Sequence, residues 1–357
     1  MTRRPAVLLV ASILAACTTP PTPTLEPTGA GLAPSPTASA RTESATPSAS
    51  PSPSAAAEPT FEMATYPVAP GSRPHDVAPA ADGGIWYSGQ GNGTLGWLDP
   101  ETGELREVAL GPGSAPHGVI TGPDGAAWLT DDGLNAIVRV DGDSLAVTTY
   151  PLDVANANLN TATFDGEGIL WFTGRSGIYG RLDPTTGALE TFTAPRGAGP
   201  YGIATLPDGE VAYSSLAGSY LGILDRSSGE VEVVDTPTAG GGARRVWADS
   251  SGGLWVTEWF AGSLARYDPV DGTWQEWRLP GDTPQPYAVY VDETDAVWVT
   301  DFGANAIHRF EPGAEAWTTF PHSGSPANVR QLLGRAGEVW GAESATDRLV
   351  VVRRTDG

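Results

Sequence analysis

Two histidines that each follow a proline are the side chains of this chain best suited to chemistry. They are His75 in Arg-Pro-His and His117 in Ala-Pro-His. Imidazole titrates near neutral pH and also binds divalent metals through its ring nitrogens. Two acidic residues, Asp131 and Asp132, follow the second histidine in the sequence. Two imidazoles together with one carboxylate would be able to act as a base or to hold a divalent cation.

A tryptophan that recurs about every 42 residues indicates how the chain would bring these side chains together. It occurs in six copies of a repeat and is replaced by alanine in one more, at Trp86, Trp128, Trp171, Ala212, Trp255, Trp298 and Trp340. Each copy contains short apolar strands separated by turn residues, such as Gly-Pro-Asp-Gly at 122–125. One such unit cannot bury both faces of its small sheet. Seven copies therefore predict an all-β protein, a seven-bladed β-propeller.

The repeat also predicts which other residues share one mouth of the propeller with the histidines. In a propeller the first strand of each blade lines the central channel, and the second strand runs back beside it. The start of the first strand and the end of the second therefore meet at the same mouth. The polar residues at these two positions are predicted to form the rim of a ligand-binding funnel: Asn160, Tyr201, Arg244, Glu258, Tyr287, Asp301 and Glu343.

The other histidines and two recurring aspartates are interpreted as structural. His308 is expected in an outer strand and His322 in a linker, which predicts surface positions for both. Asp99 and Asp183 lie in Asp-Pro-x-Thr-Gly segments, where they are expected to be turn residues only.

The net charge and the missing residue types exclude several classes of function. The formal net charge is −22, and all 20 basic residues are arginine. Nucleic acid is excluded as a partner, because no basic surface is predicted that could meet its phosphates. The absence of lysine excludes Schiff-base chemistry. Because Cys17 is the sole cysteine, disulfides and a cysteine nucleophile are excluded within the repeats.

The segment before the repeats has the pattern of a targeting sequence followed by a linker. Residues 1–17 contain Arg3 and Arg4, a short apolar stretch and a final Leu-Ala-Ala-Cys, as in a signal peptide. This ending resembles a bacterial lipoprotein signal, which implies a lipid on Cys17 and anchoring in the cell envelope, at the outer face of the plasma membrane. An ordinary secretory signal or an inserted anchor is the alternative. Residues 18–59, rich in Pro, Ser, Thr and Ala, are predicted to be a disordered tether, which leaves 60–357 for the propeller.

The two ends of the repeat region are predicted to complete one blade together. The segment 61–68 resembles the fourth strand of the other copies, although it precedes the first copy. The last copy ends without a fourth strand of its own. We therefore expect 61–66 to pair with the strand around 349–352, which closes the ring and removes an exposed sheet edge.

The recurring pattern x-Pro-[His/Tyr]-Gly-[Ile/Val], followed by Pro-Asp-Gly-x-x-Trp and Thr-[Asp/Glu], resembles the virginiamycin B lyase (streptogramin lyase) family. Residues 114–140 are its best instance. The resemblance implies a seven-bladed propeller that opens a cyclic type B streptogramin by β-elimination at its ester, with Mg²⁺ and a histidine base. His75 and His117 match the two Pro-His motifs of the family, and Asp131 or Asp132 stands where its second glutamate would be. Ala115 replaces the first glutamate, which removes a carboxylate from the implied metal site.

The first functional hypothesis is therefore an elimination lyase in which His117 is the general base. His75 and Asp131 or Asp132 would position a Mg²⁺ that polarises the carbonyl of the substrate. The alternative is a non-catalytic cell-envelope module that binds a peptide, glycan or protein through the same funnel. A sugar-lactone hydrolase is a third class, but such propellers usually have six blades. A monomer is expected, with a small-molecule or peptide ligand in the funnel and membrane contact only through the lipid on Cys17.

Overall fold

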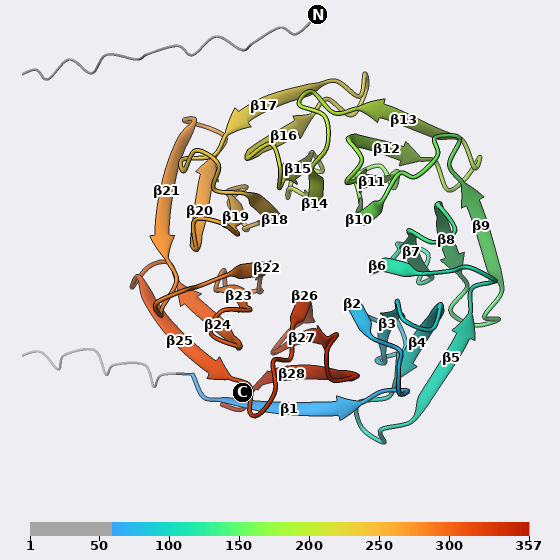
Figure 1. The fold of residues 1–357 in the computed structure, drawn as a ribbon, viewed down its shortest axis with the longest axis horizontal. Helices are drawn as coiled ribbons and strands as arrows, with labels where there is room; N and C mark the ends of the chain where they lie inside the picture. Colours follow the sequence, from blue (N-terminus) through green and yellow to red (C-terminus); the bar gives the residue numbers. More distant parts are fainter. Residues whose placement is uncertain (1–58, 357) are drawn as a thin grey trace, which may run out of the picture. The chain divides into compact units, whose positions relative to one another are not determined.

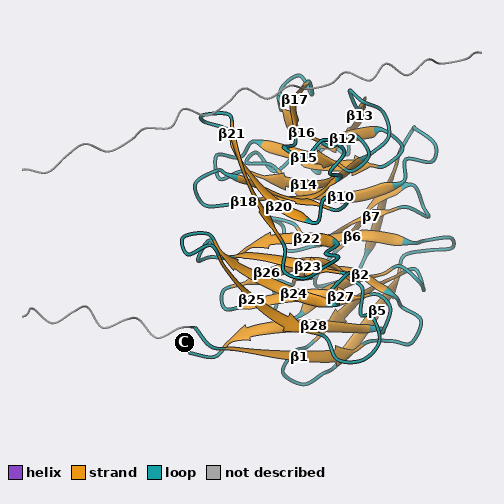
Figure 2. Cartoon of the chain, turned by 60° about the vertical axis from the view of Figure 1, so that its left-hand side comes forward, coloured by secondary structure: helices purple, strands orange, loops and turns teal. Residues whose placement is uncertain are grey.

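The computed structural model describes residues 59–356, which form a ring of seven four-stranded antiparallel sheets (Figure 1). The predicted seven-bladed β-propeller is therefore confirmed. Within this range the regular elements are all strands, as Figure 2 shows, and no helix is long and apolar enough to cross a membrane. The predicted signal peptide with Cys17, and the predicted tether up to Glu58, lie outside the described residues.

Six blades consist of four consecutive strands, with the innermost strand first. Blade 1 has β2 (Pro74–Pro79), β3 (Ile85–Gly89), β4 (Thr94–Leu98) and β5 (Leu105–Ala109). Blade 2 has β6 (Pro116–Thr121), β7 (Ala127–Asp131), β8 (Ala136–Val140) and β9 (Val147–Pro151). Blade 3 has β10 (Leu159–Phe164), β11 (Leu170–Gly174), β12 (Ile178–Leu182) and β13 (Leu189–Thr193). Blade 4 has β14 (Pro200–Thr205), β15 (Val211–Ser215), β16 (Tyr220–Leu224) and β17 (Val231–Asp235).

The remaining blades follow the same order until the last. Blade 5 has β18 (Ala243–Ala248), β19 (Leu254–Glu258), β20 (Ser263–Asp268) and β21 (Thr273–Arg278). Blade 6 has β22 (Pro286–Val291), β23 (Val297–Asp301), β24 (Ala306–Glu311) and β25 (Ala316–Pro321). Blade 7 has β26 (Val329–Arg335), β27 (Glu338–Glu343) and β28 (Arg348–Arg354), with β1 (Phe61–Pro67) as its outer strand.

The seventh blade is closed by the N-terminal strand, as predicted. β1 pairs with β28 over seven residues, from Phe61 opposite Arg354 to Pro67 opposite Arg348. In Figure 1 the blue β1 lies on the outer edge of the red β28. The Phe61 ring also packs edge-on against Trp298 of blade 6, with the ring centroids 5.5 Å apart. The strand therefore joins blade 7 to blade 6 and covers the edge of its own sheet.

Each inner strand carries a β-bulge near its start. In blade 1, Pro74 pairs with Gly89 but Val77 pairs with Tyr87, so the two residues between them on β2 face a single residue of β3. The same kind of register shift occurs at the start of the inner strand in all seven blades. A bulge re-aims side chains locally. In blade 1 the bulge therefore makes two consecutive residues, His75 and Asp76, available to the channel.

A hydroxyl residue two positions after the repeat tryptophan holds these bulges in place. In blade 1, Ser88 Oγ accepts the N–H of Asp76 at 2.9 Å and donates to the carbonyl of His117 in blade 2 at 2.7 Å. Equivalent pairs of bonds join the next blades and are made by Thr130, Thr173, Ser214 and Thr257. Neighbouring blades are thereby fastened together at the channel wall, at the backbone that carries the predicted site residues.

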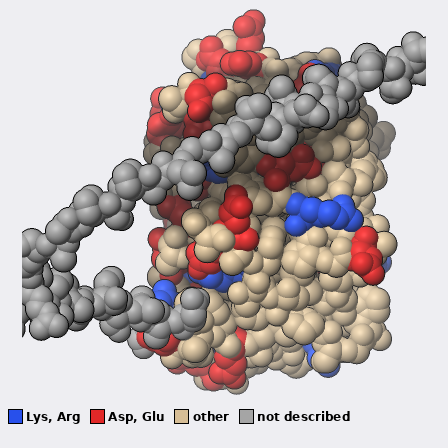
Figure 3. Space-filling model, turned by 90° about the vertical axis from the view of Figure 1, so that its left-hand side faces the viewer, with Lys and Arg blue, Asp and Glu red and all other residues tan. Residues whose placement is uncertain are grey.

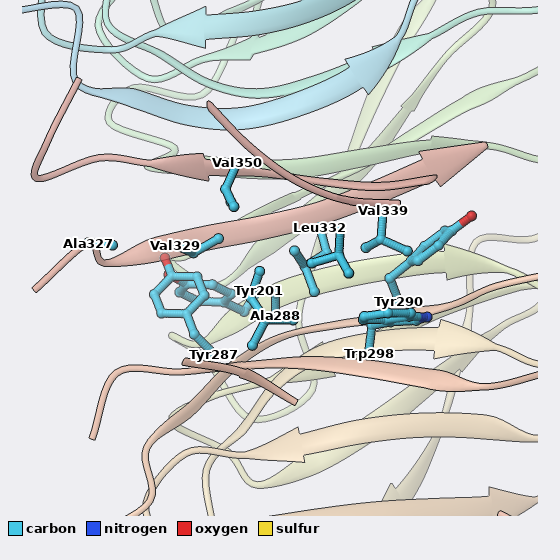
Figure 4. Close-up of a cluster of buried hydrophobic side chains, with 12 residues drawn as sticks. Tyr201, Tyr287, Ala288, Tyr290, Trp298, Ala327, Val329, Leu332, Val339 and Val350 are labelled. Atoms are coloured by element: carbon cyan, nitrogen blue, oxygen red, sulfur yellow. The ribbon is translucent and has the colours of Figure 1, made fainter. Parts of the chain in front are cut away.

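The repeat tryptophans join the cores of neighbouring sheets. Those of blades 2, 3, 5, 6 and 7 are at most 1% exposed. Trp171 Nε1 donates to Asp165 in the preceding turn at 2.9 Å, and Trp255 makes the same bond to Asp249. The turn aspartate therefore satisfies a buried indole N–H, which explains why the two residues recur together. Figure 4 shows the cluster in which Trp298 packs beside the inner strands of blades 6 and 7.

The exposed turns carry much of the negative charge. Asp99 accepts the N–H of Glu101 and the hydroxyl of Thr102, and Asp183 makes the corresponding bonds in its own turn. Both aspartates are turn residues, as predicted. On the side of the ring seen in Figure 3, acidic side chains are widespread and arginines are few.

Candidate functional site

Side chains from widely separated blades meet in the channel at the level of the bulges. Arg245 of β18 crosses to Asp76 of β2, with its Nη2 donating to Asp76 Oδ1 at 3.2 Å. Nη1 of the same guanidinium donates to the hydroxyl of Thr161 on β10 at 2.5 Å. Arg245 is 4% exposed and Asp76 is 1% exposed. This buried ion pair links blades 1, 3 and 5 and lies at the centre of the candidate site.

His75 and His117, which were predicted on adjacent blades, are in contact with each other. Their ring centroids are 3.7 Å apart, and both residues are buried. His75 Nδ1 lies 2.7 Å from Asp76 Oδ1. Because a carboxylate paired with Arg245 is an acceptor, His75 Nδ1 carries the ring proton and Nε2 keeps its lone pair. The cluster of His75, Asp76 and His117 brings one ligand atom from each residue within 4.8 Å of the others.

A chain of hydrogen bonds that begins at Arg245 sets the tautomer of His117. Arginine can only donate, so the Thr161 hydroxyl accepts from it and donates its own proton to Asn160 Oδ1 at 2.8 Å. Asn160 Nδ2 then faces His117 Nε2 at 3.2 Å, and this ring nitrogen must accept. A neutral His117 therefore carries its proton on Nδ1, which is buried and has no hydrogen-bond partner among the described residues.

The surroundings keep both imidazoles neutral. Burial lowers the pKa of His75 well below its ordinary value, and the positive charge of Arg330, followed by other arginines, lowers it further. Burial likewise lowers the pKa of His117 well below its ordinary value. Burial raises the pKa of Asp76, against the opposing effect of the Arg245 charge. His75 therefore has a free lone pair at neutral pH with a carboxylate behind it.

The other half of the channel is aromatic. The hydroxyls of Tyr201 on β14 and Tyr287 on β22 are 2.7 Å apart, and the two side chains lie side by side in Figure 4. Arg244 donates to the Tyr201 hydroxyl at 2.9 Å, and its guanidinium carbon lies 3.8 Å from the centroid of the Tyr287 ring. Asn160, Tyr201 and Tyr287 are at most 3% exposed. These predicted rim residues are therefore packed inside the channel and do not form an open rim.

The acidic residues at the ends of the second strands mainly hold loops. Asp131 accepts the hydroxyl of Ser114 at 2.5 Å and the N–H groups of Ala115 and Leu134, each at 2.9 Å. Asp132 lies 3.5 Å from an Arg175 nitrogen. Neither aspartate belongs to the group of His75, Asp76 and His117, whose possible ligand atoms lie within 4.8 Å of one another. The carboxylate that lies beside the two histidines is that of Asp76.

The other predicted rim acids follow the same pattern with one exception. Asp301 accepts the N–H groups of Gln285 and Gly303, and Glu343 accepts the hydroxyl of Thr346. Glu258 is fully buried, and neither of its carboxylate oxygens has a hydrogen-bond partner within residues 59–356. Burial raises the pKa of Glu258 to about 7. This carboxyl group therefore changes its charge near neutral pH.

The two histidines that were expected at the surface are not exposed there, so this prediction is wrong. His308 lies on β24, the third strand of its blade, and is 1% exposed because its ring reaches inward to Asp301, with Nε2 3.4 Å from Oδ2. The His322 side chain is 5% exposed because its Nδ1 lies 3.0 Å from Glu343 Oε1. Neither residue belongs to the His75–His117 cluster.

Three residues of the site, Asp76, Thr161 and Arg245, were missed. Side chains alternate along a regular strand, so only one residue at the start of each inner strand was predicted to face the channel. The bulge adds the residue that follows. A signal was present in the sequence at the position ten before the repeat tryptophan. Four copies have a small residue there, whereas copies 1, 5 and 7 have the charged residues Asp76, Arg245 and Arg330.

The cluster does not fit Mg²⁺. This ion prefers oxygen ligands in octahedral geometry and keeps several waters. Here two of the three ligating residues offer nitrogen, and the carboxylate of Asp76 is already paired with Arg245. The same arginine charges that lower the pKa of His75 would also repel a divalent cation.

A cavity of about 830 Å³ lies away from this cluster, between the turns of blades 3 and 4. Its two arginines are already paired, Arg181 with Glu190 at 2.7 Å and Arg226 with Glu210 at 2.9 Å. It is lined by no histidine. The chemistry of the described residues therefore points to the channel and not to this cavity.

Comparisons with known proteins agree with the fold and identify a family. No curated protein sequence matches the chain significantly. A solved streptogramin B lyase is 21% identical over 83% of this chain and 98% of its own, with a TM-score of 0.76. Virginiamycin B lyase from Staphylococcus aureus is 19% identical over 82% of this chain and 99% of its own, with a TM-score of 0.77. A catalytically inactive histidine-to-alanine variant of that lyase, with quinupristin, gives the same values.

At these identities the likeness to solved structures concerns the fold. The model of the virginiamycin B lyase family matches residues 55–225 and 104–356, which together span the whole ring. The chain therefore belongs to the virginiamycin B lyase family.

Proposed function

We propose that this chain is a carbon–oxygen lyase that opens a cyclic or ester-linked substrate by elimination. The observation that carries the proposal is the buried pair of His75 and Asp76 in the channel, with His75 Nδ1 2.7 Å from the carboxylate. A histidine whose far nitrogen is held by a carboxylate is a general arrangement for a base. Membership of the virginiamycin B lyase family supports elimination as the type of reaction.

In the proposed step, His75 Nε2 takes a proton from the carbon next to a carbonyl group. The electrons of that carbon–hydrogen bond form a carbon–carbon double bond, while the ester carbon–oxygen bond breaks and the oxygen leaves as a carboxylate. Asp76 holds the Nδ1 proton of His75 and stabilises the imidazolium that forms. The Nδ1 proton of His117 is available to the carbonyl oxygen on which negative charge develops.

This proposal moves the base from His117 to His75. His117 Nε2 is engaged with Asn160, and its Nδ1 carries a proton, so neither nitrogen of the neutral ring offers a free lone pair. His75 Nε2 makes no hydrogen bond with the described residues. Mg²⁺ stays a prediction of the resemblance, and the reaction proposed here relies on the protein's own side chains.

The test is to incubate the purified protein with a type B streptogramin and to follow the linear product by mass spectrometry, with millimolar Mg²⁺ and with a chelator. We expect turnover in both conditions, loss of turnover in His75→Ala and a large decrease in Asp76→Asn. His308→Gln, which changes a buried histidine on a third strand, is the control. Wild-type turnover by His75→Ala would refute the assignment of the base, and no product from any ester-linked cyclic peptide would refute the lyase.

A second candidate is a non-catalytic module that binds a peptide, glycan or protein at the same mouth. Two observations favour it. His75, His117 and both channel tyrosines are buried, and Ala115 stands in place of the family glutamate. Binding of a streptogramin without any linear product would support this candidate over the lyase.

For the location, we propose an extracytoplasmic monomer anchored in the cell envelope through a lipid on Cys17. The Leu-Ala-Ala-Cys ending of residues 1–17 supports this. Metabolic labelling with a radioactive fatty acid should label the wild type and not Cys17→Ala, and size-exclusion chromatography with light scattering should give the monomer mass. Equal labelling of the two proteins would contradict the lipid anchor.

A further inference from the structure

Two arginines at the aromatic half of the channel have no acidic partner. The guanidinium carbons of Arg244 and Arg330 lie 3.8 Å and 5.9 Å from the centroid of the same Tyr287 ring. Neither arginine forms an ion pair with a carboxylate of the described residues, although acidic residues outnumber basic ones by 42 to 20 in the chain. Arg245 also lies near this ring, but its charge is matched by Asp76. The site therefore carries an excess of positive charge.

Unused hydrogen-bond donors at the same place point to a ligand. Arg244 Nε and Arg245 Nε are both buried nitrogens without a partner among the described residues. Each of these guanidinium nitrogens carries a proton and can only donate. A buried donor without a partner is costly, so a ligand that brings acceptor oxygens would be stabilised here. Arg245 is 4% exposed.

The acidic residues of the same blades do not neutralise this charge. Asp301 is bonded to loop N–H groups, and Glu343 is bonded to Thr346 and His322. Glu258 of blade 5 forms no ion pair with either arginine, and burial raises its pKa to about 7, so it is only partly charged at neutral pH. The excess positive charge is strong enough to lower the pKa of Tyr287: burial would raise it, but Arg244, Arg245 and Arg330 outweigh burial. An anion is therefore the partner that the electrostatics favour.

Aromatic side chains next to the arginines indicate what the anion is attached to. Trp259 packs edge-on against Tyr287 and Phe302, with centroid distances of 5.9 and 5.5 Å, and Phe302 stacks on Tyr287 at 4.8 Å. Both Trp259 and Phe302 are partly exposed, and Phe260 beside them is 67% exposed. Half-exposed aromatic rings beside a cation favour a ligand with an apolar, planar part.

We propose that the mouth of blades 5 to 7 binds an aromatic carboxylate, with Arg244 and Arg330 on the carboxylate and Trp259 and Phe302 on the ring. The role of this binding site rests on the proposed function, because elimination at an ester releases a carboxylate. The arginines would then hold the leaving group or an acidic part of the substrate. The binding itself requires no turnover.

The experiment is isothermal titration of the full chain with 3-phenylpropionate, 3-phenylpropanol, propionate and inorganic phosphate as probes. We expect 3-phenylpropionate to bind and each of the other three to bind at least about tenfold more weakly, as the loss of a charge-assisted hydrogen bond or of aromatic burial predicts. Equal binding of 3-phenylpropanol would overturn anion recognition, and equal binding of phosphate or propionate would overturn the aromatic part.

Variants test the assigned residues. Arg330→Gln and Arg244→Gln should each weaken 3-phenylpropionate at least about tenfold. Arg278→Gln is the matched control, since Arg278 is an exposed arginine of blade 5 that bonds only to backbone carbonyls. Arg330→Gln keeps the test decisive if the more enclosed Arg244 variant does not fold. Unchanged binding of 3-phenylpropionate to Arg330→Gln would overturn the proposal. If the wild type binds 3-phenylpropionate but does not turn over a streptogramin, the binding site stands and only the lyase is refuted.

Discussion

Replacing Arg245 by glutamine should show how much stability the ion pair across the channel provides. The substitution removes a guanidinium that is 4% exposed and leaves Asp76, which is 1% exposed, without its charged partner. It also removes the donor to Thr161. Because these contacts link blades 1, 3 and 5, we expect the whole ring to lose stability and not only one blade.

The size of the loss follows from the burial of the pair. Removing one partner of a buried ion pair typically costs about 3–5 kcal/mol, since a buried charge is left unpaired. For a domain of about 300 residues the entropy of unfolding is roughly 0.6 kcal/mol/K, so this loss lowers the melting temperature by about 5–8 °C. The double variant Asp76→Asn with Arg245→Gln buries no charge and should recover most of the loss.

The loss should also depend on pH with a defined sign. Burial already raises the pKa of Asp76 above its unfolded value, and removing Arg245 raises it further. A group whose folded pKa is raised loses stability as pH increases, so the deficit of Arg245→Gln should be larger at pH 8 than at pH 5.

The assay is denaturant unfolding of the wild type, both single variants and the double variant at these two pH values. Additive losses, with no recovery in the double variant, would refute the reasoning that this pair couples the blades.

Three other changes test the fold. Deleting residues 18–58 should leave the melting temperature nearly unchanged, whereas deleting through Pro67 should cost several kcal/mol because β1 and its Phe61 contacts are lost; equal midpoints in calorimetry would contradict closure by β1. The folded pKa of Glu258 of about 7 exceeds the ordinary value of 4.5, so the contribution of Glu258 to stability should fall as pH rises from 4.5 through 7. Glu258→Gln should therefore be more stable at pH 8 by roughly 1–3 kcal/mol, and an unchanged pH profile would exclude the buried charge as the cause. Thr173→Val should cost about 1–3 kcal/mol in denaturant unfolding because the Thr161 N–H and the Tyr201 carbonyl lose their partner, with the exposed Thr318→Val as control; equal stability of the two variants would show that the hydroxyl does not hold the blades.

Much of the architecture was predictable because each blade is local in the sequence. Its strands follow one another through short turns, so the tryptophan spacing and the turn aspartates, such as Asp99 and Asp183, report directly on strand pairing. The closing strand was predictable as well, because 61–66 repeats the fourth-strand pattern and the last copy lacks one. The contact between His75 and His117 follows from the same logic, since adjacent copies form adjacent blades.

The chemistry of the site depended on contacts that the repeat does not encode. Asp76 and Arg245 are 169 positions apart, and they meet only because seven sheets close into a ring of one particular diameter. The bulges that turn these residues toward the channel are held by hydroxyls and carbonyls of two different blades. The burial of His308, the tautomer of His117 and the unpaired charges of Arg244 and Arg330 follow from that assembly. The sequence by itself determined the blades, their number and their closure, because these rest on local strand pairing. Only the tertiary structure decided which side chains face one another across the channel, because that depends on the packing of all seven blades at once.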